Sequence, residues 1–164
     1  MSTLPQVLDP CCGGKMLWFN KNDRRAAFCD IRRENHILCD GRVFEVNPDT
    51  VCDFRKLPFP DESFYLICFD PPHLWRAGET SWIRKKYGSL DRLTWSEDLS
   101  KGFDECWRVL KPGGTLIFKW AEVQIRLKDV ISCFPRRPIF GHTTTKSLKT
   151  HWIVFYKEEV CPKS

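Results

Sequence analysis

The residues most able to do chemistry in this chain are Asp70, Pro71, Pro72 and His73, which directly follow the apolar run 64–69. A buried strand that ends in this way holds a carboxylate and a stiff turn at one edge of a sheet. Because proline has a preset φ and no N–H group, such a turn offers hydrogen-bond acceptors and few donors. The aspartate carboxylate and a neighbouring backbone carbonyl can each accept one hydrogen of an –NH2 group. The pattern therefore indicates chemistry on an exocyclic amine, with a purely structural proline turn as the alternative.

Acidic residues also end three other apolar runs. These three residues are Asp9, Asp30 and Asp53, so that with Asp70 four acids follow apolar runs. Asp9 lies close in sequence to the Gly13-Gly14 pair. In an open parallel sheet, ligands bind at the carboxyl ends of the strands. An aspartate after a strand is also a common helix cap or turn former, so each acid has a structural interpretation too. Four acids at one predicted edge favour a binding site there.

The segment 74–95 is rich in Trp, Lys, Arg and Gly and has no regular period, so we interpret it as a mobile flap with some helix. Aromatic and cationic side chains interleaved beside a pocket suit single-stranded or extruded nucleic acid, through stacking and phosphate contacts. A solvated basic loop with its aromatics tucked into the fold is the alternative. The candidate nucleic-acid contacts are Trp75, Arg76, Trp82, Arg84, Lys85, Lys86 and Tyr87, with Lys146, Lys149 and His151 nearer the carboxyl end.

The elements that position these residues alternate between strands and helices. Apolar runs predict strands at residues 6–9, 26–30, 50–53, 64–70 and 115–120. Asp40-Gly41 predicts a hairpin between residues 37–39 and 43–46. Helices are predicted at 15–20, from Thr94 to the Lys111–Gly114 stop, and at 123–134. Residues 138–140 and 151–156 can pair as a closing hairpin. This order predicts one α/β domain over 1–164, with a mostly parallel sheet and an antiparallel element at its end.

Composition narrows the classes of protein that remain. The 164 residues carry a net charge of +5, which is compatible with a polyanionic partner. The nine cysteines include no C-x-x-C pair, so we expect free thiols, no metal site and a reducing cytoplasm. No apolar stretch approaches the ~20 residues needed to span a bilayer.

Three segments resemble the class I S-adenosylmethionine-dependent methyltransferases. Residues 6–14, Q-V-L-D-P-C-C-G-G, are similar to the first motif of the family in its amino-methyltransferase form. Residues 52–70 look like its third and fourth motif region, and 107–118, W-R-V-L-K-P-G-G-T-L-I-F, look like the approach to its fifth strand. The D-P-P-H turn resembles the signature of enzymes that methylate exocyclic nitrogens of nucleobases, most often adenine N6. The resemblance covers about residues 6–120 and implies a Rossmann-like, doubly wound sheet.

The resemblance also implies roles for particular residues. S-adenosyl-L-methionine would lie against the first motif, where Gly13 and Gly14 allow close backbone approach. Asp9 would hold its ammonium group, Asp30 its ribose hydroxyls, and Asp53 its adenine amine. The remaining implied cofactor contacts are Pro10 and Cys11 of the first motif and Phe54, for which core packing is an equal alternative.

In the transfer itself, Asp70 and the Pro71 carbonyl would grip the target amine and stabilise the positive charge that develops on it. Pro72 completes the turn. His73 would stack on the base or accept the proton afterwards, with a solvent-exposed turn histidine as the alternative.

The chain departs from the family pattern at three points. His73 stands where an aromatic residue is usual, the first motif has Cys11-Cys12 and two glycines, and no segment resembles a separate target-recognition domain. DNA and RNA therefore both remain possible substrates, and a helper subunit could supply target recognition. A methyltransferase of small molecules and a non-catalytic subunit that binds cofactor or RNA are the other interpretations. A cytosine C5 enzyme is disfavoured, because its nucleophilic cysteine would stand where His73 does.

Overall fold

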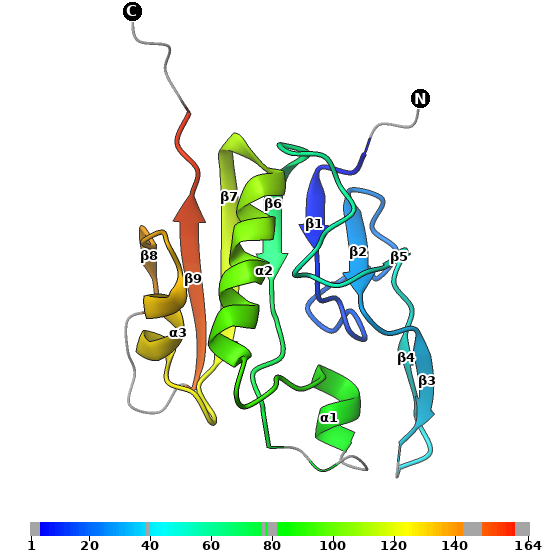
Figure 1. The fold of residues 1–164 in the computed structure, drawn as a ribbon. Coiled ribbons are helices and arrows are strands. Elements are labelled where there is room, and N and C mark those ends of the chain that lie inside the picture. Colours follow the sequence, from blue (N-terminus) through cyan, green and yellow to red (C-terminus); the bar gives the residue numbers. More distant parts are fainter. Residues whose placement is uncertain (1–3, 39, 77, 79–81, 143–148, 160–164) are drawn as a thin grey trace, which may run out of the picture.

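A seven-stranded sheet forms the centre of the molecule (Figure 1). The computed structural model describes residues 4–38, 40–76, 78, 82–142 and 149–159, with Trp82 described by its backbone alone. The strand order is β5-β2-β1-β6-β7-β9-β8. The strands are β1 (Val7–Asp9), β2 (Ala26–Asp30), β5 (Thr50–Val51), β6 (Phe64–Phe69), β7 (Leu110–Ala121), β8 (Phe140–Gly141) and β9 (Thr150–Tyr156).

The pairing confirms the predicted mixture of directions. Strands β5, β2, β1, β6 and β7 are parallel, whereas β9 runs antiparallel to β7 and to β8. From β1 the chain proceeds to β2 and β5 on one side and then returns to β6 on the other. This reversal at β1 is the position where an α/β sheet opens a crevice at the carboxyl ends of its strands.

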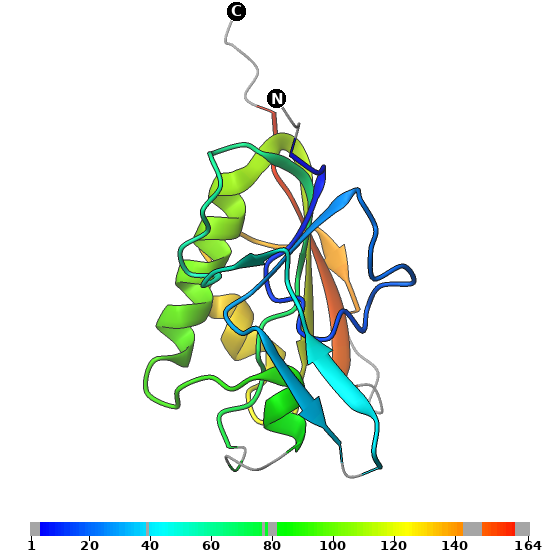
Figure 2. The same ribbon diagram turned by 90° about the vertical axis from the view of Figure 1, so that its right-hand side faces the viewer.

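Helices α2 (Trp95–Val109) and α3 (Leu127–Cys133) pack on the same face of the sheet (Figure 2). Leu99, Phe103 and Cys106 recur at three- and four-residue spacing on α2 and are completely buried against strand residues such as Phe118. The opposite face at β1 and β2 is covered by the loop after β1. There the indole of Trp18 meets the ring of Phe28 edge to face, with 4.8 Å between their centroids.

The connection from β2 to β5 contains the predicted hairpin, formed by β3 (Glu34–Ile37) and β4 (Val43–Val46). Its antiparallel register pairs Ile37 with Val43 across the Asp40-Gly41 turn. Gly41 has a φ of 80°, a conformation that glycine adopts at little cost. In Figure 1 the hairpin projects from the carboxyl end of β2.

The prediction of a helix at residues 15–20 is wrong. Lys15 has a φ of 53° and Gly13 a φ of 48°, and this left-handed backbone cannot start a right-handed helix. The segment forms successive turns instead, and the Trp18 Nε1–H donates to Asp9 Oδ2 at 2.7 Å. The side chain of Trp18 therefore fixes this loop.

Two further elements are shorter than predicted. The third core strand, expected at 50–53, is the two-residue edge strand β5, and Val51 is 49% exposed. It ends because Asp53 accepts a hydrogen bond from the Arg55 backbone N–H and so begins a turn. The helix predicted at 123–134 begins at Leu127, because the preceding residues form a loop in which the Ile125 carbonyl accepts from Trp120 Nε1.

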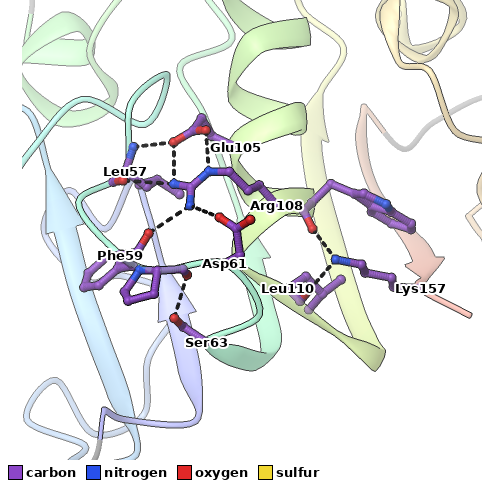
Figure 3. Close-up of polar contacts among 10 residues, drawn as sticks. Leu57, Phe59, Asp61, Ser63, Glu105, Arg108, Leu110 and Lys157 are labelled. Atoms are coloured by element: carbon purple, nitrogen blue, oxygen red, sulfur yellow. Dashed lines mark hydrogen bonds and ion pairs between the residues drawn. The ribbon is translucent and has the colours of Figure 1, made fainter. Parts of the chain in front are cut away.

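The strand ends opposite the crevice are joined by Arg108 (Figure 3). Its guanidinium donates to both carboxylate oxygens of Glu105, to Asp61 Oδ1 and to the carbonyls of Leu57 and Phe59. Beside it, Lys157 Nζ donates to the carbonyls of Trp107 and Leu110. These bonds tie the segment before β6 to the carboxyl end of α2, where the helix would otherwise leave carbonyls unpaired.

Candidate active site

A cavity of about 980 Å³ opens at the carboxyl ends of β1, β2, β5, β6 and β7. It brings together residues that the sequence places far apart, including both the first motif and the proline turn. The predicted residues that line it are Asp9, Pro10, Cys11, Gly13, Gly14, Asp30, Asp53, Phe54, Asp70, Pro71, Pro72, His73, Arg84, Lys85, Lys86 and Tyr87.

The other predicted contacts differ in position. Trp75 is half-buried, with its ring centroid 6.5 Å from that of Trp95 next to the core, and Lys149 is exposed; neither lines the cavity. The Trp82 side chain and Lys146 lie outside the described part of the chain. His151, also proposed for the surface, is buried and lies 3.1 Å from a carboxylate oxygen of Glu122. Arg76 is exposed beside the turn.

Asp70 stands at the end of β6 with one of its carboxylate oxygens already bound. Lys119 Nζ donates to Asp70 Oδ2 at 2.8 Å, and the two side chains are 15% and 19% exposed respectively. Within the described residues, Asp70 Oδ1 and the Pro71 carbonyl accept no hydrogen bond. Burial raises the pKa of Asp70 and the Lys119 charge lowers it in part. Two acceptors of the kind that an –NH2 group needs are therefore open on one turn.

His73 is buried, with 8% exposure, rather than a solvent-exposed turn residue. Its ring centroid lies 5.4 Å from that of Tyr87 and 6.2 Å from that of Trp120. Burial, with the Lys119 charge second, lowers the pKa of His73 to about 4. The imidazole is consequently neutral at pH 7 and a weak proton acceptor there.

Asp9 is almost inaccessible, with 2% exposure, and both of its oxygens have partners. Oδ1 accepts from the Cys11 N–H at 3.2 Å and Oδ2 from the Trp18 indole. Burial raises the pKa of Asp9 to about 7, against the lowering effect of these two hydrogen bonds. Asp9 therefore shapes the loop of the first motif and lies poised between charged and neutral forms.

Asp30 and Asp53 are likewise bound by the protein. Asp30 Oδ2 accepts from the Gly13 N–H at 2.9 Å, and its Oδ1 accepts from the backbone and side chain of Arg32. Asp53 accepts from the Arg55 side chain, which lowers the pKa of this carboxyl. Asp30 Oδ2 accepts one hydrogen bond and keeps a lone pair for a ligand. Both oxygens of Asp53 already accept two donors of Arg55, so Asp53 can accept from a ligand only in exchange for one of these bonds.

The two glycines of the first motif are required for different reasons. Gly13 has positive φ, and a Cβ there would lie 3.4 Å from the Lys86 carbonyl. A Cβ on Gly14 would lie 2.5 Å from the ring of Phe44 in the β3–β4 hairpin. Gly14 is thus needed for packing of the hairpin against the loop.

Phe54 serves the core and the cavity together. Its ring centroid lies 5.7 Å from that of Phe69, and a Cβ on Gly102 of α2 would come within 2.3 Å of its ring. The same side chain lines the cavity. Core packing is therefore present, and contact with an adenine remains a prediction.

Helix α1 (Trp82–Tyr87) and the residues after it close one side of the cavity. Arg32 Nη1–H donates to the Lys85 carbonyl at 2.7 Å, and Gly88 lies against the Pro72 ring. The segment beyond the turn is held by Gln124, whose Oε1 accepts the N–H groups of Trp75 and Arg76.

Sequence reasoning missed Arg32, Gln124 and Lys119. A lysine inside the apolar run L-I-F-K-W was the available signal for Lys119.

The residues present fit S-adenosylmethionine. The cavity has room for a molecule of drug size and more. Asp30 stands at the carboxyl end of β2, beside the glycine turn, where the acid of a dinucleotide-binding sheet meets ribose hydroxyls. Asp53 and Phe54 stand at the neighbouring strand end, where an adenine would meet a carboxylate and a ring.

The arrangement of strands and helices resembles solved methyltransferases. An S-adenosylmethionine-dependent methyltransferase from Leishmania major superposes with a TM-score of 0.51 and 13% identity, over 91% of this chain and 63% of that one. The chain has a methyltransferase fold. Weaker likenesses are to a candidate DNA modification methylase from Thermus thermophilus (TM-score 0.43, 18% identity, 68% of this chain and 53% of that one) and an S-adenosylmethionine-dependent methyltransferase from Mesorhizobium loti (TM-score 0.36, 17% identity, 74% and 49%).

The superpositions thus cover between 49% and 63% of the length of these solved chains. No protein-family model and no curated protein matches this chain. In the part of the chain that the structure describes, no helix has both the length and the apolar character needed to cross a membrane.

Proposed function

We propose that the chain is an S-adenosylmethionine-dependent methyltransferase that acts on an exocyclic amine of a nucleobase in nucleic acid, with adenine N6 favoured. The observation that carries this proposal is the pair of open acceptors, Asp70 Oδ1 and the Pro71 carbonyl, in the same cavity as the Gly13 turn. The sequence-based hypothesis required these features to meet, and an aspartate turned away from the glycines would have removed its basis.

The cofactor, when bound, supplies an electrophilic methyl group on a sulfonium. The amine held by Asp70 and the Pro71 carbonyl would take this methyl group, and the electron pair of the broken bond would stay on the sulfur of the departing thioether. The lone pair of an aryl amine is delocalised, so alignment and electrostatic stabilisation are the main contributions open to the protein. Asp70 and Pro71 would accept the two N–H groups and favour positive charge on nitrogen. The proton then leaves to Asp70 or to water, because His73 is a weak base at pH 7.

Contacts beyond the amine would come from α1. Tyr87 is half-buried on the cavity wall beside His73 and offers a ring for stacking on the base. Arg84, Lys85 and Lys86 on the same helix would meet the phosphates. A base in a duplex would have to be flipped out of its stack to reach this turn.

The test is transfer of a labelled methyl group from S-adenosylmethionine to DNA, to RNA and to a small-molecule extract in parallel. We expect label in nucleic acid, released as a base-methylated nucleoside on digestion. Label confined to small molecules would contradict the proposal and support a small-molecule methyltransferase, which would use the same cofactor-binding residues.

A further inference from the structure

Lys119 is a largely covered cation beside the turn that would bind the target amine. It occupies β7 two residues before the end of the strand, and its side chain is 15% exposed. The register sets Phe118 beside Phe69, so Lys119 and Asp70 follow side by side on neighbouring strands. Across the sheet, Lys119 faces Trp152 of β9, with Nζ 6.0 Å from the centre of that ring.

We propose that Lys119 is a positioning residue for methyl transfer, which it serves by binding Asp70 Oδ2 and leaving Oδ1 as the oxygen that receives the amine. This inference rests on the proposed function. A carboxylate bound through one oxygen to a fixed cation cannot rotate freely, and the geometry of the open oxygen is then set before the substrate arrives. A single open carboxylate oxygen also matches the single hydrogen that Asp70 must accept, since the Pro71 carbonyl accepts the other.

The second contribution of Lys119 is to keep Asp70 charged. The titratable groups around this carboxylate are Asp9 at the end of β1, Cys11 after it, Cys68 on β6, His73 in the turn and Lys119 on β7. Lys119 is the one cation of this set. Burial favours the protonated carboxyl, and the Lys119 ammonium opposes that effect directly. A protonated Asp70 would lose the negative charge that balances charge developing on nitrogen.

An ion pair that served the fold alone would look the same in a static structure. The two roles differ in the pH dependence of transfer. If Lys119 holds Asp70 ionised for the reaction, removal of its charge shifts the acid limb of the kcat/KM profile upward. A purely structural pair would change the stability of the protein and leave the midpoint of that limb in place.

The experiment compares Lys119→Gln, Lys119→Arg and Lys101→Gln with the unaltered protein between pH 5 and pH 9. Lys101 is a matched control on α2, where it is 57% exposed and pairs with Glu97. We expect the acid-limb midpoint of Lys119→Gln to rise by about 1–3 pH units, which is the range for loss of a neighbouring opposite charge. Transfer by Lys119→Gln should recover at high pH, where Asp70 is ionised without the lysine. Lys119→Arg should restore part of the normal pH profile, and Lys101→Gln should have the profile of the unaltered protein.

The ¹³C shift of the Asp70 carboxyl provides a readout that does not depend on transfer. Its titration midpoint should be higher in Lys119→Gln than in the unaltered protein. If that variant does not fold, the Lys119 Nζ shift in the unaltered protein should follow the Asp70 titration. The inference would be overturned if the Asp70 midpoints of the two proteins were equal or if the acid limb of Lys119→Gln did not move. It would also be overturned if the Lys119 Nζ shift did not change as Asp70 titrates. Absence of transfer by the unaltered protein to any substrate would instead overturn the proposed function on which it rests.

Discussion

Arg108 and Asp70 lie at opposite ends of the sheet and differ in how fully their polar atoms are hydrogen-bonded. At the amino ends of β6 and β7, every guanidinium nitrogen of Arg108 donates a hydrogen bond, and Glu105 accepts through both oxygens (Figure 3). At the carboxyl ends, Asp70 pairs through one oxygen and leaves the other open. The guanidinium of Arg108 has no nitrogen left for a ligand and serves the fold, whereas the open oxygen of Asp70 can bind a ligand.

This contrast separates the motifs by purpose. Residues 57–64 and 107–114 belong to two of the segments that resemble the methyltransferase family, and they meet around Arg108 at the end of the sheet away from the cavity. The turn at Asp70 lies in the cavity. These runs therefore stabilise the fold, whereas the proposed chemistry depends on the turn.

The largest expected effect is on transfer and comes from Asp70→Ala. Loss of the open carboxylate should lower kcat/KM about 10²–10³-fold, the range seen when one group that stabilises a developing charge is removed. Cofactor affinity, measured by calorimetry, should stay within about two-fold, because under the proposal Asp70 binds the substrate amine and not the cofactor. The matched change at the other end is Asp61→Ala, which removes an exposed partner of Arg108 and should leave transfer unchanged. Equal losses in both variants would break the comparison.

Arg108→Ala should lower stability and leave methyl transfer unchanged. It leaves Glu105 with the Leu57 N–H alone and removes the Arg108 donors of two backbone carbonyls, at a cost of about 2–3 kcal/mol in the free energy of unfolding. Urea denaturation measures this loss, and transfer per folded molecule should not change. The control, Arg25→Ala, removes an exposed pair with Asp23 and should change the free energy of unfolding far less. A large fall in transfer by folded Arg108→Ala would contradict the division between the two ends.

The buried acid of β1 should make stability depend on pH. Because the pKa of Asp9 is raised from 3.8 to about 7 on folding, the folded state binds one more proton than the unfolded state between these values. This group therefore favours the folded state fully below about pH 4, and its contribution is lost as the pH rises through 7. Between pH 5 and pH 7 the loss should be about 2 kcal/mol.

Asp9→Asn keeps an acceptor for Trp18 and removes the charge. The unfolding free energy of the unaltered protein, relative to that of Asp9→Asn, should fall from pH 5 to pH 7 and then level off. A difference that is constant with pH would show that Asp9 titrates normally in the fold.

A smaller effect on stability is expected at Phe54, which lines the cavity and packs in the core. Gly102→Ala places a methyl group against Phe54, so the ring must move, at a cost of about 1–2 kcal/mol. If Phe54 contacts the cofactor adenine, affinity for S-adenosylmethionine should fall as well. Lys101→Ala, on the exposed side of the same helix, is the control. Normal cofactor affinity in Gly102→Ala would assign Phe54 to the core alone.

The smallest effect should come from a single phosphate contact. Lys85→Ala should weaken nucleic-acid binding uniformly across sequences and reduce the salt slope of log K by about 1. Fluorescence anisotropy at several salt concentrations measures both quantities. An unchanged slope would remove Lys85 from the interface.

The sequence predicted strands and the main helix well because their patterns are local. Apolar runs marked β2, β6 and β9, and the spacing of Leu99, Phe103 and Cys106 marked α2. The failure at residues 15–20 arose from backbone conformation, since left-handed φ at Lys15 depends on how the loop closes over Asp9. Such closure is a tertiary effect that a pattern of residue types does not contain.

The sequence named many of the residues that line the cavity, but it named neither Arg32 nor Lys119 and none of the pairings among these residues. Strand order brings the four acids to one edge, and that much follows from alternation of strands and helices. The bond from Lys119 to Asp70 joins residues 49 positions apart, and the Arg32 contact with Lys85 joins residues 53 positions apart. Both depend on the register and on the path of α1, which no local spacing encodes.

The position of the transferred methyl group tests the central claim most directly. After reaction with labelled S-adenosylmethionine, nucleic acid is digested to nucleosides and the labelled product is identified by mass spectrometry. Hydrogen bonds from an –NH2 group to Asp70 and the Pro71 carbonyl predict a methyl group on an exocyclic nitrogen, chiefly N6 of adenine. Asp70→Ala should form this product about 10²–10³-fold more slowly. A methyl group on a ring carbon, a ring nitrogen or the ribose would contradict it.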